Sequence, residues 1–237
     1  MTRIYLIRHG EAEGNIYRRA QGQYESELSA KGERQVAALA ERFREEKIDA
    51  LYSSDLRRTQ KTAGAITKYH DLPLHLDARL RELALGAWED VPFGDLEWRY
   101  GEQMDYFNND PERWHAEGAE SFAQLKARMR AVIDELAEKH AGETVVCCSH
   151  GMAIRALLSD ILTANFGSDE FFINKAIGWS LRDYGQYDPR WVSRIIDRHK
   201  DKMSRLSIRE GSKYLPAGQT ASKPHTGDPT TSAPLPQ

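Results

Sequence analysis

Residues 144–151 read Thr-Val-Val-Cys-Cys-Ser-His-Gly, and this stretch decides the fold. Its apolar, β-branched run predicts a buried strand that ends just before His150, with a helix beginning after the glycine. The chain begins with the same pattern, because the apolar run of residues 3–7 leads into Arg8-His9-Gly10. Two histidines therefore directly follow two predicted strands.

Predicted strands alternate with amphipathic helices along most of the chain. Further strands are expected at 48–52, 179–184 and 191–196, while Ser29 and Ser121 are expected to begin two of the helices. This alternation predicts an α/β fold. We expect a three-layer sandwich in which a mainly parallel central sheet of about six strands is flanked by helices.

Composition predicts one folded domain and a tail. The chain has 237 residues, of which 40% are hydrophobic, so residues 1–212 are long enough and apolar enough for one α/β domain. Within it, residues 86–118 are aromatic and acidic and are predicted to form a cap-like insertion. Residues 213–237 are rich in Pro, Thr, Ser, Gly and Ala, which predicts a disordered tail.

Charge and cysteine content exclude several classes of protein. The net charge of −3 offers no basic face for nucleic acid and no attraction to an anionic membrane. The N-terminal apolar run is too short for a signal peptide or a membrane span. Cys147 and Cys148 are neighbours in a strand and point to opposite faces, so we expect reduced thiols and a cytoplasmic protein.

Histidine and arginine side chains lie where the two strands end. Ligands of open α/β sheets bind beyond the carboxyl ends of the strands, so His9 and His150 are candidates for one site. Arg8 could hold an oxyanion through two hydrogen bonds, and the helix after His150 would direct backbone N–H groups toward an anion. Each residue alone also has an ordinary structural explanation, a buried histidine or a surface ion pair. Their matching positions favour an anion-binding site.

Five blocks of sequence resemble the histidine phosphatase (phosphoglycerate-mutase-like) superfamily, in the order which that family shows. Together they span roughly residues 3–200. The blocks are Leu6-Ile7-Arg8-His9-Gly10-Glu11 with Asn15 beyond it, Leu28-Ser29-Ala30-Lys31-Gly32 with Gln35 beyond it, an arginine block at 53–63, an acid block at 81–89, and Ser149-His150-Gly151.

The resemblance implies a role for each matching residue. His9 is the nucleophile that forms a phosphohistidine through its Nε2 atom, and Glu82 is the general acid and base. Arg8, Arg58 and His150 surround the transferred phosphoryl group. The other implied phosphate-binding or substrate-binding residues are Gly10, Asn15, Gln21, Gly22 and Gly151.

These residue types suit phosphoryl transfer without a metal or another cofactor. The transition state is loose, so catalysis depends on positioning and on stabilising spread negative charge, which two guanidinium groups and an imidazole can do. Cations around His9 should lower its pKa, and a backbone carbonyl is expected to accept its Nδ1–H.

Arg57 is expected to face solvent. The six other histidines show no metal-ligand spacing.

The same site could serve a phosphatase or a cofactor-dependent phosphoglycerate mutase. The stretch between Glu82 and His150 is shorter than in those mutases, and the acid block resembles the phosphatase branch. Residues 89–120 carry ten acidic residues against two arginines, which would repel a multiply anionic bisphosphoglycerate if they cap the pocket. The alternative is that these acids lie on a solvated outer face.

We therefore predict a phosphomonoesterase that acts on a small organic phosphate. A non-catalytic phospholigand-binding regulatory protein would keep the same pocket without turnover and is the alternative from another class. Glu120 could line the site or cap the following helix. The sequence leaves the natural substrate and the oligomeric state open, a homodimer included.

Overall fold

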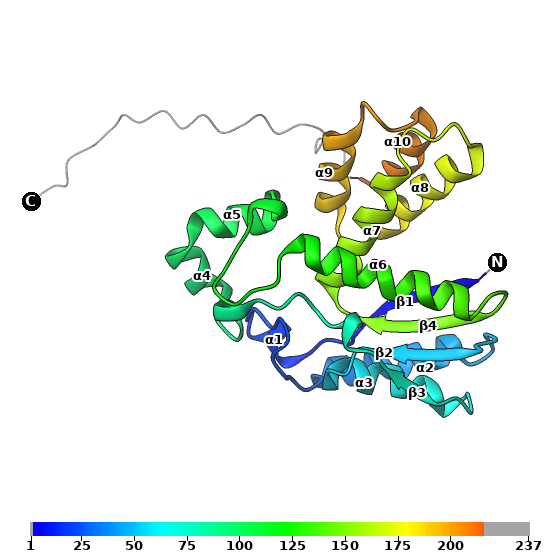
Figure 1. The fold of residues 1–237 in the computed structure, drawn as a ribbon. Coiled ribbons are helices and arrows are strands. Elements are labelled where there is room, and N and C mark those ends of the chain that lie inside the picture. Colours follow the sequence, from blue (N-terminus) through cyan, green and yellow to red (C-terminus); the bar gives the residue numbers. More distant parts are fainter. Residues whose placement is uncertain (1, 216–237) are drawn as a thin grey trace, which may run out of the picture. The chain divides into compact units, whose positions relative to one another are not determined.

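The computed structural model describes residues 2–215, and its helices and strands are labelled in Figure 1. The strands are β1 (Arg3–Arg8), β2 (Ala50–Ser53), β3 (Leu74–Leu76) and β4 (Thr144–Ser149). The α-helices are α1 (Glu13–Ile16), α2 (Ala30–Phe43), α3 (Arg57–Gly64), α4 (Phe93–Arg99), α5 (Gly101–Asn109), α6 (Phe122–Lys139), α7 (Gly151–Ala164), α8 (Phe171–Tyr184), α9 (Pro189–His199) and α10 (Arg205–Gly211). Short 3-10 helices are η1 (Ile66–Lys68), η2 (Ala78–Leu80), η3 (Gly86–Trp88) and η4 (Pro111–Arg113).

The chain divides into two compact units. The first runs from Met1 to Asp160, and the second begins at Ile161. From composition, one domain was expected over residues 1–212. The predicted disordered tail, 213–237, lies outside the described residues from position 216 onward.

The first unit is built on a parallel sheet with strand order β1-β4-β2-β3. All neighbouring strands in it pair in parallel. The α/β class and the parallel sheet are confirmed, but the expected number of about six strands is wrong, because the sheet formed by residues 2–215 has four. Strands β1 and β4 pair in register from Arg3 opposite Thr144 to Arg8 opposite Ser149, so their carboxyl ends are level.

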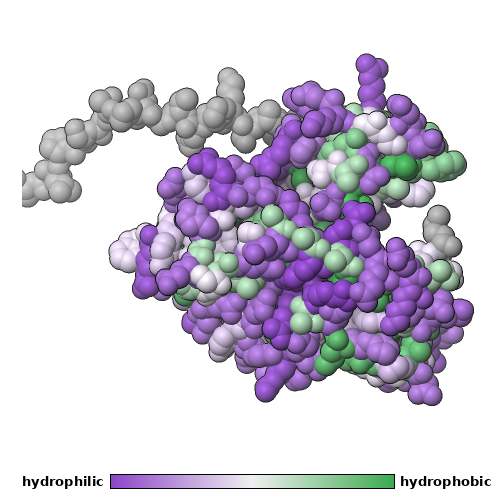
Figure 2. Space-filling model, viewed as in Figure 1, coloured by the Kyte–Doolittle hydropathy of each residue, from purple (hydrophilic) through white to green (hydrophobic). Residues whose placement is uncertain are grey.

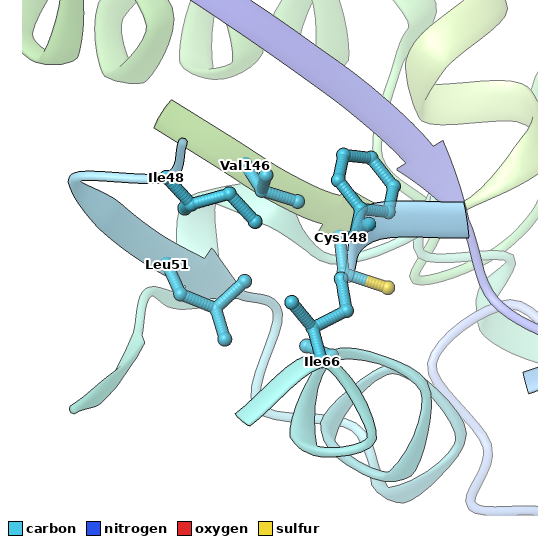
Figure 3. Close-up of a cluster of buried hydrophobic side chains, with 7 residues drawn as sticks. Ile48, Leu51, Ile66, Val146 and Cys148 are labelled. Atoms are coloured by element: carbon cyan, nitrogen blue, oxygen red, sulfur yellow. The ribbon is translucent and has the colours of Figure 1, made fainter. Parts of the chain in front are cut away.

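Helices cover both faces of this sheet (Figure 1). On one face, residues of β2 and β4 pack with Phe43 of α2 and with the segment after it, in the cluster of Phe43, Ile48, Leu51, Ala63, Ile66, Val146 and Cys148 (Figure 3). On the other face, the Tyr52 hydroxyl lies 2.9 Å from Lys139 Nζ, near the end of α6. The alternation of Leu51 and Tyr52 follows the two-residue period of a strand.

Two helices begin at the capping residues that the sequence predicts. The Ser29 side chain accepts a hydrogen bond from Gly32 N at the start of α2. Ser121 and Gln124 form the predicted capping box at the start of α6. At the start of α3, Leu56 is the N-cap residue, and its side chain makes no capping hydrogen bond.

Both cysteines are buried and free, on opposite faces of β4 as predicted. Burial raises the pKa of the Cys147 thiol to about 12. The thiols therefore behave as small apolar side chains.

The second unit contains helices where two strands were predicted. Residues 179–184 belong to α8 and residues 191–196 belong to α9, so both predicted strands are wrong. The apolar positions explain this result, because α9 buries Trp191, Val192, Ile195 and Ile196, which recur with the period of a helix. The Asp188 side chain also caps α9 by accepting from Trp191 N.

The segment predicted as a cap-like insertion, 86–118, consists of short helices and turns. Its buried aromatic residues form a cluster, with the rings of Trp88 and Trp114 at 5.3 Å and those of Phe107 and Trp114 at 5.2 Å. These rings anchor the segment in the core. The ten acidic residues counted from the sequence include six that are exposed, namely Asp95, Glu97, Glu102, Asp105, Glu112 and Glu117.

Hydrophilic residues cover most of the face shown in Figure 2, in line with the mean hydropathy of −0.66. Among the described residues, no helix combines the length and the apolar character that crossing a bilayer requires.

The loop after His9 is fastened to the start of α2, where Gly32 has no room for a side chain. A Cβ atom at position 32 would lie 2.0 Å from Glu11 O. We expect Gly32→Ala to lower the free energy of unfolding by about 1–3 kcal/mol, because backbone must move to relieve the contact. Urea denaturation measures this loss.

Gly64→Ala is the matched control, because a Cβ atom there would meet nothing within 4 Å. Its stability should be unchanged or raised by up to about 1 kcal/mol. Equal stabilities of the two variants would contradict the close contact at Gly32.

Candidate active site

The register of β1 with β4 brings the two strand-end histidines together. His9 and His150 follow Arg8 and Ser149, which are paired, and His9 N donates to Ser149 O at 3.1 Å. The centroids of the two imidazole rings are 5.2 Å apart, and the ring planes are inclined by 57°. Both side chains are buried.

His9 has a defined tautomer. Its Nδ1 atom lies 2.7 Å from Gly10 O, and because a carbonyl oxygen can only accept, Nδ1 carries the hydrogen. The Nε2 atom therefore holds the lone pair. Gly10 was expected to bind phosphate or substrate, and its backbone N–H already donates to Thr62 Oγ1 at 3.0 Å.

Burial and nearby cations keep both imidazoles neutral. Burial, together with Arg58, lowers the pKa of His9 from 6.5 to about 3. Burial and Arg58 also lower the pKa of His150 well below its ordinary value. A neutral His9 is the nucleophilic form.

Arg58 is a buried guanidinium whose Nε atom has no hydrogen-bond partner among residues 2–215. Its two terminal nitrogens donate to Tyr24 O and Gly22 O, both at 2.7 Å. The neighbouring Arg57 lies in the opposite environment, since it is exposed and pairs with Glu27 at 3.3 Å.

His150 also has one ring nitrogen in use and one open. Its Nε2 atom lies 2.8 Å from Ser54 Oγ. Its Nδ1 atom is buried without a hydrogen-bond partner among residues 2–215. His150 and Arg58 thus each bury a polar atom that lacks a hydrogen-bond partner among the described residues. Buried polar atoms normally have a partner, and a bound anion would supply one here.

Arg8 lies beside Gly151. A Cβ atom at position 151 would be 3.3 Å from Arg8 Nε and 3.4 Å from Arg8 Cζ. The glycine thus leaves room for the guanidinium at the start of α7. Arg8 also contributes to the lowered pKa values of His9 and His150, which places its charge near both rings.

Glu82 occupies the start of α7, where the sequence predicted that backbone N–H groups would face an anion. Its carboxylate accepts from Met152 N at 3.0 Å, from Ala153 N at 2.9 Å and from Leu83 N at 2.9 Å. The Glu82 carboxyl group is therefore the acceptor at this helix start. Three backbone donors fix its carboxylate in place.

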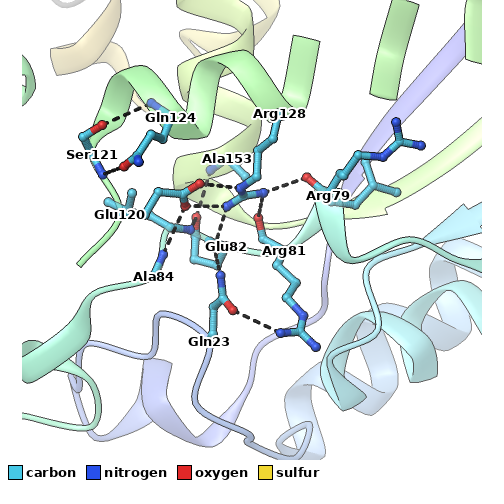
Figure 4. Close-up of polar contacts among 12 residues, drawn as sticks. Gln23, Arg79, Arg81, Glu82, Ala84, Glu120, Ser121, Gln124, Arg128 and Ala153 are labelled. Atoms are coloured by element: carbon cyan, nitrogen blue, oxygen red, sulfur yellow. Dashed lines mark hydrogen bonds and ion pairs between the residues drawn. The ribbon is translucent and has the colours of Figure 1, made fainter. Parts of the chain in front are cut away.

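Arg128 of α6 holds the peptide that carries Glu82 (Figure 4). Its guanidinium donates to the carbonyl oxygens of Arg79 and Arg81 at 2.7 Å and of Glu82 at 2.9 Å. It also pairs with Glu120 through two contacts of 2.6 and 2.8 Å. Among residues 2–215, Glu120 makes no hydrogen bond to His9, and Ser121 rather than Glu120 caps α6. Glu120 pairs instead with Arg128, which holds the Glu82 peptide.

The remaining candidates lie in the loop after His9. Asn15 is exposed, and its Oδ1 atom accepts from Ala12 N at 3.0 Å. Gln21 is half-buried and accepts from Ser26 Oγ at 2.7 Å, while Gly22 contributes its carbonyl to Arg58. Among residues 2–215, no hydrogen bond joins Asn15 or Gln21 to the two histidines, so their phosphate-binding role stays a prediction.

No group of three or more His, Cys, Asp or Glu side chains able to hold a metal ion occurs among residues 2–215.

Comparison with known proteins matches this arrangement to one family. The model of the histidine phosphatase superfamily (branch 1) matches residues 4–197. The chain belongs to this superfamily. Its known members include phosphatases and mutases, which both transfer phosphoryl groups.

Proteins similar to this superfamily member carry different names. A Yersinia enterocolitica protein named probable phosphoglycerate mutase GpmB is 40% identical over 162 residues, which cover 68% of this chain and 75% of the relative. Bacillus stearothermophilus YhfR has a TM-score of 0.66 at 29% identity, over 69% of this chain and 81% of that one. A mycobacterial glucosyl-3-phosphoglycerate phosphatase with VO3 has a TM-score of 0.63 at 32% identity, over 68% and 83%.

Three residues at this histidine phosphatase site were not among the sequence candidates. Ser54 contacts His150, Thr62 holds Gly10, and Arg128 holds the Glu82 peptide. Ser54 follows β2 directly, so its strand-end position was a usable signal. Thr62 and Arg128 lie within helices, where nothing local distinguishes them.

The lowered pKa of His9 predicts how stability depends on pH. Unfolded, His9 takes up a proton near pH 6.5, but folded it does so only near pH 3. Its stabilising contribution is therefore complete above pH 6.5 and is lost as the pH falls toward 3, by up to about 1.4 kcal/mol per pH unit. When the pH falls from 6.5 to 5, the free energy of unfolding measured by urea denaturation should decrease less in His9→Asn than in the wild type. Parallel pH dependence of the two proteins would contradict the buried, neutral imidazole.

Proposed function

We propose that this chain is a metal-independent phosphomonoesterase that hydrolyses a small organic phosphate through a phosphohistidine on His9. The observation that carries the proposal is the His9 tautomer. Its Nδ1–H is bound to Gly10 O, so the Nε2 lone pair is available beside His150 and Arg58. The two free cysteines support a cytoplasmic location as a further part of the proposal.

In the first step, His9 Nε2 attacks phosphorus and the ester P–O bond breaks. The transferred group is flanked by the open Nε–H of Arg58, the open Nδ1 of His150 and the Arg8 guanidinium. These groups stabilise the charge that spreads over the equatorial oxygens. In this step the Glu82 carboxyl group, fixed at the start of α7, is the protonated form, and it gives its proton to the leaving alkoxide.

In the second step, water attacks the phosphohistidine and the P–N bond breaks. Glu82 now takes a proton from the attacking water, which restores the carboxylic acid. His9 Nε2 recovers its lone pair, and inorganic phosphate leaves. Neither step calls for a metal ion.

Two observations favour hydrolysis over transfer to a second substrate hydroxyl. The solved structures similar to this chain include a glucosyl-3-phosphoglycerate phosphatase and a putative alpha-ribazole-5'-P phosphatase from Escherichia coli. Residues 89–120 carry an excess of acidic side chains that disfavours a bisphosphorylated cofactor, although six of the ten face solvent. We therefore propose a substrate whose leaving group is not strongly anionic.

The mutase is the second candidate, and the 40% identity to proteins named probable phosphoglycerate mutase GpmB favours it. Both activities begin with the same phosphohistidine. They differ in whether water or a substrate hydroxyl receives the phosphoryl group.

The test measures phosphate release from a panel of phosphomonoesters, including p-nitrophenyl phosphate, in EDTA. Phosphoglycerate interconversion is measured in parallel with bisphosphoglycerate added. We expect hydrolysis that EDTA does not inhibit, with little interconversion. Efficient interconversion with slow hydrolysis would sink the phosphatase proposal, and phosphate binding without turnover would leave a binding protein.

A further inference from the structure

Ser54 lies at the third strand end of the site, next to the two histidines. It follows β2, and its backbone N–H donates to Cys148 O at 3.0 Å, which joins it to β4 just before His150. The Ser54 side chain is completely buried. Its hydroxyl reaches His150 Nε2 at 2.8 Å.

The neighbours of the Ser54 hydroxyl limit where its proton can go. Thr59 Oγ1 lies 2.7 Å from Leu56 O and 3.0 Å from Ser54 O, two acceptors for its own proton. Leu56 N donates to Ser54 Oγ at 3.3 Å. The Ser54 proton is then left to His150 Nε2 at 2.8 Å or to Thr59 Oγ1 at 3.0 Å.

These two directions give opposite tautomers of the neutral His150. If Ser54 donates to Nε2, the hydrogen of the ring lies on Nδ1, the open atom. If Ser54 donates to Thr59, His150 Nε2–H donates to Ser54 and the open Nδ1 carries a lone pair. A lone pair there would repel the oxygens of a phosphoryl group, whereas an Nδ1–H would bind one.

We infer that Ser54 is a positioning residue that donates its proton to His150 Nε2 and so holds His150 as an Nδ1–H donor toward the phosphoryl group. This inference rests on the proposed function, since it needs an anion between His150 and Arg58. The two histidines then divide the work: each is neutral and protonated on Nδ1. His9 turns its unprotonated Nε2 to phosphorus, while His150 turns its protonated Nδ1 to an oxygen.

The tautomer is read directly by 15N NMR of protein labelled at histidine, with inorganic phosphate bound. Protonated and unprotonated ring nitrogens differ widely in 15N shift, and His150→Gln identifies the signals of His150. In the wild type we expect Nδ1 protonated and Nε2 unprotonated. In Ser54→Ala we expect the Nε2–H tautomer to appear and kcat to fall about tenfold to a hundredfold.

Thr59→Val is the matched control. It removes the other acceptor of the Ser54 proton and keeps the volume of the buried side chain, so the wild-type tautomer and kcat should remain. Ser54→Thr, which keeps the hydroxyl, should restore the Nδ1–H tautomer that Ser54→Ala loses.

A wild-type spectrum with the hydrogen on His150 Nε2 would overturn the inference, even if Ser54→Ala fails to fold. An unchanged tautomer in a folded Ser54→Ala would overturn it as well. The spectrum needs phosphate binding but no turnover. A protein that shows the expected tautomer and hydrolyses nothing would therefore sink the proposed function and leave the role of Ser54 intact.

Discussion

Exchange of His9 for alanine is expected to lower kcat for p-nitrophenyl phosphate by about 10⁴-fold or more. The reason is that His9 forms the covalent bond to phosphorus in the proposed mechanism. His9 Nε2 is the one lone pair that the Gly10 hydrogen bond presents to phosphorus, and a neighbouring imidazole cannot replace it, since His150 Nε2 is bonded to Ser54. The loss should exceed that of any variant that only weakens charge stabilisation.

The measurement combines steady-state hydrolysis in EDTA with trapping of the intermediate. Wild-type protein quenched during turnover of a 32P-labelled substrate should carry acid-labile label, and His9→Ala should carry none. His115→Ala is the control, because His115 is exposed in the segment after α5. Equal labelling of wild type and His9→Ala would place the nucleophile elsewhere.

Arg58→Lys is expected to lower kcat/KM by about 10²–10³-fold, although the charge is kept. The buried guanidinium bonds the carbonyls of Gly22 and Tyr24 with two nitrogens and leaves Nε–H free. A lysine ammonium is a single point and cannot reach both carbonyls and a phosphoryl oxygen together. The loop that contains Gly22 should also lose its anchor.

The adjacent Arg57→Lys is the matched control. Arg57 is exposed and pairs with Glu27, so its exchange should leave kcat/KM within about twofold of the wild type. Steady-state kinetics of both variants on the same substrate make the comparison. Similar losses in the two variants would show that Arg58 acts through general charge rather than through its hydrogen bonds.

The elements set by local signals could be predicted from the sequence. The run over 144–149 matches β4, Ser29 caps α2, and Ser121 with Gln124 caps α6, because each depends on residues within one turn. Residues 179–184 and 191–196 were wrongly predicted as strands. Short apolar runs suit either structure until packing shows which residues are buried.

The site was predictable where it follows the strands and not where it depends on packing between distant segments. His9 and His150 stand next to predicted strands, and their meeting follows from parallel pairing. Arg128 lies in the middle of α6, and its contacts with the carbonyls of residues 79, 81 and 82 exist only after α6 packs against them. The contact of Ser54 with His150 likewise joins residues 96 apart in sequence.

The pairing of Arg8 with Ser149 makes the spacing of the backbone that carries the two imidazoles a property of the sheet. That backbone cannot slip unless the hydrogen bonds between two strands shift, and a shift by one residue would turn each side chain to the opposite face. The two histidines therefore start from fixed neighbouring positions. The segments at residues 11–28 and 86–118 lie outside the paired strands, so adaptation to a larger or smaller leaving group is expected there.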